Sequence, residues 1–107
     1  MRLHALIESE GLVPVASLHA GGWEWGAIAV YYKPDARRFF WLSESGCSCT
    51  YFGDGSSYAL GDFQDGDRQA AIEALKGFSH WDDTPGRDDV EREATNVRNY
   101  KYEEISK

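Results

Sequence analysis

The chain has 107 residues and a formal net charge of −7. This length suits one domain and is sufficient to bury a modest core without metal ions or disulfides. Because 42% of the residues are hydrophobic and 14% are aromatic, the composition excludes an intrinsically disordered chain. The negative charge disfavours nucleic-acid or anionic-membrane binding, since both need a basic surface, and it is compatible with a basic protein partner.

The N-terminal part predicts a short helix followed by a strand. An apolar stripe favours a helix over residues 2–9, which Gly11 ends. Leu12–Leu18 is rich in strand-forming residues, and Pro14 favours an edge position because proline cannot donate a backbone hydrogen bond. Early charged residues are not typical of a signal peptide, and no apolar segment approaches the roughly 18 residues of a membrane span. We therefore expect a cytoplasmic protein.

The region that organises the fold is a predicted hairpin. In the strand Trp23–Tyr32, alternate residues point to opposite faces, and both faces become apolar toward the end. That pattern is typical of a central strand covered on both sides. A turn at residues 33–36 leads to the return strand Arg37–Leu42. With Leu12–Leu18, these strands predict a three-stranded antiparallel meander.

Two helices are predicted after a serine-, glycine- and aspartate-rich loop at residues 43–57. The first, Asp67–Phe78, has an apolar stripe and an aspartate that can cap its start. Residues 84–107 mix charges of both signs with a thin apolar stripe. We expect this segment to be an exposed helix, or a helix followed by a strand from Tyr100, that packs weakly on the sheet.

The predicted fold class is therefore α+β. It combines the meander, one helix packed on one face of the sheet, and a charged C-terminal helix. The chain is expected to be a single domain, with a core over residues 1–81 and a charged segment over residues 82–107. No linker is long enough to separate two domains.

The apolar residues of the hairpin and of the C-terminal segment could either pack in the core or bind a partner. Tryptophans on neighbouring strands commonly form core pairs, whereas tryptophan and tyrosine are also enriched at the energetic centres of interfaces. A helix with a thin apolar stripe is marginal alone, so it should find a second surface on the chain or on a partner. We expect a protein partner or a homo-oligomer. The candidate partner-binding residues are Trp23, Trp25, Trp41, Val90, Val97 and Tyr100.

The two cysteines lie in a tight loop that could carry chemistry. A structural zinc ion needs four Cys or His ligands, and the three histidines have no ligand-like spacing. A thiol nucleophile needs a base, and no spacing indicates one. Because residues two apart rarely reach disulfide geometry without strain, we expect reduced thiols that point inward as small apolar residues. We predict no metal, cofactor or catalytic residue. The loop consists of Ser45, Gly46, Cys47, Ser48 and Cys49.

The order of these motifs resembles a family of small uncharacterised proteins encoded by bacteriophages of actinobacteria. The shared motifs are Gly-Gly-x-x-Trp, Val-Tyr-Tyr, Phe-x-Trp-x-Ser-x-Ser-Gly-Cys-Ser-Cys, and the helix Gln-Ala-Ala-Ile-Glu-Ala-Leu. The similarity covers roughly residues 11–81. That family has no assigned activity, cofactor or site, so no functional residue can be carried over. The resemblance implies a phage gene product made in the host bacterial cytoplasm.

Small size, acidic charge and the lack of an assembled catalytic motif predict a non-enzymatic binding protein. The resemblance implies that it is phage-encoded, and we therefore expect it to act on a host or phage protein. An acidic mimic of nucleic acid is a special case, motivated by paired acids in the C-terminal segment. One alternative is a small cysteine-dependent enzyme or redox protein. Another is a structural or assembly component that uses the C-terminal segment as an oligomerisation arm.

Overall fold

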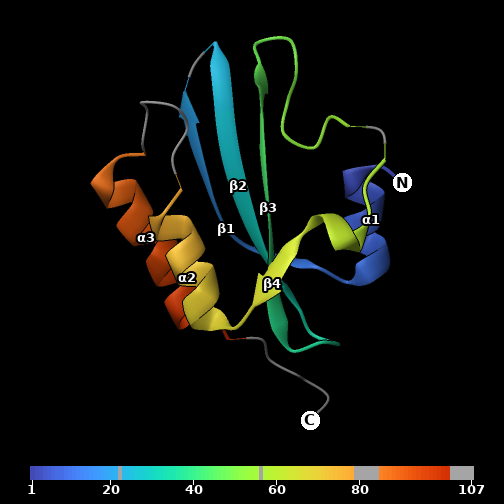
Figure 1. Ribbon diagram of the computed structural model, residues 1–107. Coiled ribbons are helices and arrows are strands. Elements are labelled where there is room, and N and C mark those ends of the chain that lie inside the picture. The colour runs from blue at the N-terminus through green and yellow to red at the C-terminus, as the bar shows by residue number, and fades with distance from the viewer. Residues whose placement is uncertain (22, 56, 79–84, 102–107) are drawn as a thin grey trace.

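The computed structural model describes residues 1–21, 23–55, 57–78 and 85–101 (Figure 1). Within these residues, four strands form one antiparallel sheet in the order β1-β2-β3-β4. The predicted α+β class is confirmed, but the sheet has four strands rather than three. The elements are α1 (Leu3–Glu10), β1 (Val13–Gly21), β2 (Glu24–Lys33), β3 (Arg38–Cys47), a 3-10 turn η1 (Leu60–Asp62), β4 (Gln64–Gly66), α2 (Arg68–Lys76) and α3 (Arg87–Asn99).

The fourth strand, β4, is the element that the sequence does not predict. Its residues are Gln, Asp and Gly, so they carry no apolar alternation that would indicate a strand. Non-local contacts with β3 hold it in place. Arg38 Nε donates to Asp65 Oδ2 at 2.7 Å, and Trp41 Nε1 donates to Gln64 Oε1 at 3.0 Å. Strand β3 also continues to Cys47, well past the predicted end at Leu42.

Two separate apolar layers cover the two faces of the sheet. Helices α2 and α3 lie on one face, and α1 lies on the other with the segment that leads to β4 (Figure 1). Because side chains alternate along β3, Phe39 and Trp41 pack under the two helices, whereas Phe40 and Leu42 pack toward α1. Central strand β2 is therefore covered on both faces, as its sequence predicts.

Helix α2 forms close to where the sequence places it. The Asp67 side chain caps its first turn by accepting a hydrogen bond from the Ala70 N–H at 2.9 Å. Its apolar stripe is almost inaccessible to solvent, since Ala71 and Leu75 are each 0% exposed. This burial anchors the helix on β3 and on α3.

Helix α3 belongs to the core, which corrects the expectation of a weakly packed tail. Ala94 and Val97 are both 0% exposed, and they pack in the same apolar layer as α2. The end of α3 is also bound by Arg68 at the start of α2, whose Nη1 donates to the carbonyl oxygens of Val97 at 2.6 Å and Tyr100 at 2.8 Å. These bonds satisfy carbonyls that a helix end otherwise leaves without a partner. The apolar stripe of α3 is thin, but its central residues Ala94 and Val97 are completely buried.

Part of the C-terminal prediction falls on residues that the structure does not cover. The alternative of a strand beginning at Tyr100 concerns mostly residues 102–107, which lie outside the described residues, as do residues 82–84. Within the described part of the chain, no helix has the length and apolarity needed to cross a membrane.

Candidate functional site

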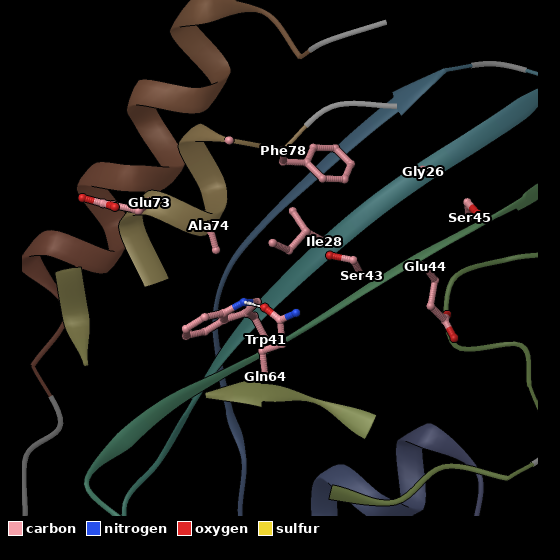
Figure 2. Close-up of a pocket in the computed structure, with 11 residues that line it drawn as sticks. Gly26, Ile28, Trp41, Ser43, Glu44, Ser45, Gln64, Glu73, Ala74 and Phe78 are labelled. Atoms are coloured by element: carbon pink, nitrogen blue, oxygen red, sulfur yellow. Dashed lines mark hydrogen bonds between the residues drawn. The ribbon is translucent and has the colours of Figure 1, made fainter. Parts of the chain in front are cut away.

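A groove of about 640 Å³ opens on the helix-covered face of the sheet, next to the end of α2 (Figure 2). Strands β2 and β3 continue beyond the end of α2, and among the described residues no helix lies above that last part of the face (Figure 1). Ile28 and Ser43 form its floor, and Ala74 and Phe78 form the wall on the side of α2. We call this cavity the α2 groove.

One end of the α2 groove is closed by Trp41. Its indole is only 7% exposed, and its Nε1 donates a hydrogen bond to Gln64 Oε1 at 3.0 Å, drawn as a dashed line in Figure 2. This bond satisfies the polar atom of the ring, so the rest of the indole can pack as an apolar surface. Strand β4 therefore orients one wall of the groove, although its sequence gives no sign of such a role.

The polar groups of the α2 groove are mainly uncharged. The Ser43 hydroxyl lies over the floor, whereas the Glu73 carboxylate points away from the cavity (Figure 2). The Glu44 carboxylate also points away, toward the opposite face of the sheet. None of the described lining residues is a lysine, arginine, histidine or cysteine. The groove thus offers apolar surface and hydroxyl groups rather than an acid–base pair or a nucleophile.

A second cavity of about 370 Å³ lies beside the turn that follows β3, and it shares Glu44 and Ser45 with the lining of the α2 groove. Trp25, which is 6% exposed, fixes this turn to β2. Its Nε1 donates to the carbonyl oxygens of Cys47 at 2.9 Å and Thr50 at 3.0 Å. The His19 ring stacks on the Trp25 indole with ring centroids 6.1 Å apart.

Cys47 and Cys49 are both exposed, which corrects the prediction that they point inward. The turn between them is closed by Thr50, whose N–H and hydroxyl both donate to the Cys47 carbonyl oxygen. Trp25 and Cys47 both line the cavity beside this turn, and of the two only the Trp25 side chain is buried. A hydrogen bond from the Cys49 thiol lowers the pKa of Cys47, and the same bond raises the pKa of Cys49. In the described residues, no group of three or more His, Cys, Asp and Glu side chains is arranged for a metal ion.

The structure separates the predicted partner-binding residues. Trp23 is 83% exposed in the turn before β2. Trp25, Trp41 and Val97 are buried, and Val90 and Tyr100 are half-buried against the apolar layer beneath α2 and α3. Of these six side chains, Trp23 alone is exposed, whereas Val90 and Tyr100 are only partly accessible. The groove residues from β3, β4 and α2 are far apart in sequence, so no local pattern could have indicated them.

Of three comparisons with known proteins, one finds a match. No curated protein and no solved structure matches the chain. The sequence profile of a family described as "Domain of unknown function (DUF7574)" matches residues 1–100. This match is wider than the span of residues 11–81 suggested by the motifs, and it includes α3. Because it covers nearly the whole sequence, the chain belongs to the DUF7574 family.

Proposed function

We propose that this protein is a phage-encoded, non-enzymatic binding protein that acts on a host or phage protein in the bacterial cytoplasm, and that the α2 groove receives the partner. The observation that carries the proposal is the lining of the groove. Ile28, Trp41 and Phe78 give it an apolar centre, and Ser43 and Gln64 supply uncharged hydrogen-bonding groups. An apolar centre with polar groups around it is the usual composition of a protein-binding surface.

The expected partner segment is apolar at its centre and basic at its flanks. An apolar side chain suits the floor at Ile28 and the ring of Phe78. The carboxylate of Glu73 stands beside the groove, and the whole chain carries a net charge of −7. A negative field of this kind accelerates association with a basic partner. The proposed phage origin rests on the sequence motifs that end in Ser-Gly-Cys-Ser-Cys.

A Ser43→Tyr variant tests the proposal because it fills the α2 groove without removing core packing. Ser43 is exposed on β3, and tyrosine is well tolerated in strands. The matched control is Thr95→Tyr, which adds the same phenol at an exposed position of α3 away from the groove. Both variants should unfold at the same urea concentration as the wild type, within experimental error.

Immobilised wild type and both variants are exposed to a lysate of an actinobacterial host, and retained proteins are identified by mass spectrometry. A retained protein is then purified and titrated against each variant. We expect Ser43→Tyr to weaken binding by tenfold or more, which corresponds to about 1.4 kcal/mol. Thr95→Tyr should bind like the wild type. Equal binding by all three proteins would place the partner surface elsewhere and refute the role of the groove.

A further inference from the structure

The exposed thiols of Cys47 and Cys49 lie outside the α2 groove and have no role in the proposed function. We propose that these two residues, here called the thiol pair, form a two-coordinate binding site for the soft monovalent ion Cu(I). The proposal rests on the spacing of two exposed cysteines in one turn and on the hydrogen bonds that hold this turn.

Both thiols are accessible and belong to one tight turn. Cys47 and Cys49 are two positions apart, the Thr50 N–H closes the turn by donating to the Cys47 carbonyl oxygen at 3.0 Å, and both side chains are exposed to solvent. An ion can therefore reach both residues without unfolding any part of the chain. When Cu(I) binds both sulfurs, the two thiol protons pass to solvent.

The backbone of the turn is fixed before any ion binds. The Cys47 carbonyl oxygen accepts three hydrogen bonds, from the Thr50 N–H at 3.0 Å, the Thr50 hydroxyl at 3.1 Å and the Trp25 indole N–H at 2.9 Å. The buried indole of Trp25 ties the turn to the central strand β2. Little additional ordering is then needed when the thiol pair binds an ion, and a preorganised site binds more tightly.

The number and chemistry of the donors select the ion. Thiolate sulfur is a soft ligand and prefers Cu(I), whereas Mg²⁺ and Ca²⁺ prefer oxygen. A structural zinc site needs four Cys or His ligands, and among the described residues nothing completes such a set around the thiol pair. Cu(I) accepts linear coordination by two sulfur atoms, so one copy of this chain provides every ligand that the ion needs.

The test uses the full-length chain, kept reduced and free of oxygen, with Cu(I) supplied as its complex with the coloured chelator bicinchoninate. Loss of colour reports transfer of the ion to the protein. We expect one Cu(I) per chain in a monomer. Because two linked ligands bind more tightly than one, Cys47→Ser and Cys49→Ser should each lower the affinity by about 10²- to 10⁴-fold. Ser48→Ala, which changes the residue between the two cysteines, should bind Cu(I) like the wild type.

Three results would overturn the proposal: an affinity equal to that of the single-cysteine variants, half an ion per chain with dimerisation, or tighter binding of Zn(II) than of Cu(I). Intact mass before each titration establishes that both thiols are reduced. The site is also separable from the proposed function, because Ser43→Tyr should leave the Cu(I) affinity unchanged. Loss of ion binding and loss of partner binding would therefore be recognised independently.

Discussion

The two faces of the sheet are held by different physical means. On the α2 and α3 face, Leu75 and Val97 are 0% exposed, and the helices satisfy their own backbone hydrogen bonds. On the opposite face, much of the cover is a loop whose backbone groups need partners from side chains. There the Glu44 carboxylate accepts hydrogen bonds from the Gly53 N–H at 2.8 Å and the Tyr58 hydroxyl at 2.7 Å. The comparison teaches that apolar burial secures both faces, and that the loop face also needs charged hydrogen bonds to hold the loop that covers it.

The largest effect is expected from Leu75→Ala on the helical face. Leu75 lies at the centre of the layer between α2, α3 and the sheet, so the substitution leaves a cavity that its neighbours fill only partly. We expect the free energy of unfolding, measured by urea titration, to fall by about 2–5 kcal/mol. The adjacent exposed residue provides the control, and Lys76→Ala should change stability by less than about 0.5 kcal/mol. A similar small loss in both variants would mean that this face is loosely packed.

A smaller effect is expected from Glu44→Gln on the loop face. The amide keeps the size of the side chain but removes the charge that strengthens the bonds to Gly53 and Tyr58. We expect a loss of about 1–3 kcal/mol in the free energy of unfolding. Glu24→Gln, at an exposed position of β2, is the matched control and should be close to neutral. If Glu44→Gln were as stable as the control, charged hydrogen bonds would not secure this face.

The loop face should also make the protein sensitive to high pH. Burial raises the pKa of Tyr31, as does the nearby Glu44 carboxylate. Burial and the hydrogen bond to Glu44 likewise raise the pKa of Tyr58. A raised pKa means that the folded chain holds the phenolic proton more tightly than the unfolded chain, whose tyrosines titrate near pH 10. The resulting stability is fully present below pH 10 and is lost as the pH rises through the folded pKa values.

Urea midpoints measured between pH 8 and pH 11 check this expectation, with Tyr58→Phe as the test variant. The wild type should lose stability above pH 10, and Tyr58→Phe should lose it less steeply because one of the two shifted groups is absent. Tyr51→Phe removes a tyrosine that is 73% exposed and should follow the wild-type curve. Identical slopes for all three proteins would show that Tyr58 does not link stability to pH.

The sequence predicts those parts of the fold in which burial leaves a local period. Alternation over Trp23–Tyr32 identifies the central strand, and the apolar stripe over Asp67–Phe78 identifies α2, because each pattern records which side of its own element is buried. The depth at which α3 packs is less evident from its sequence, because its local apolar stripe is thin. The Arg68 guanidinium that holds the end of α3 bonds to the Val97 carbonyl oxygen 29 positions away.

The candidate sites were less predictable than the elements that carry them. Nothing local distinguishes Gln64, because its role depends on reaching the Trp41 indole from a neighbouring strand. The burial of Cys47 and Cys49 does not follow from the sequence, because a small thiol suits either environment. Strand β3 also reaches Cys47, beyond the predicted end at Leu42.

The smallest effect on stability is expected from Trp23→Ala. This substitution compares an exposed tryptophan with the buried Trp25 of the same hairpin. Trp23 and Trp25 are two positions apart, yet their exposed fractions are 83% and 6%. Trp23→Ala should change the free energy of unfolding by less than about 0.5 kcal/mol, because an exposed side chain that fills no cavity leaves none when it is removed. Trp25→Phe should cost about 1–3 kcal/mol, since it leaves the carbonyls of Cys47 and Thr50 without their indole donor. A loss above 1 kcal/mol in Trp23→Ala would place its ring in the core. Unchanged stability with weaker retention of the partner would instead extend the binding surface from the α2 groove to the turn between β1 and β2, and would explain why so large an apolar side chain is left in water.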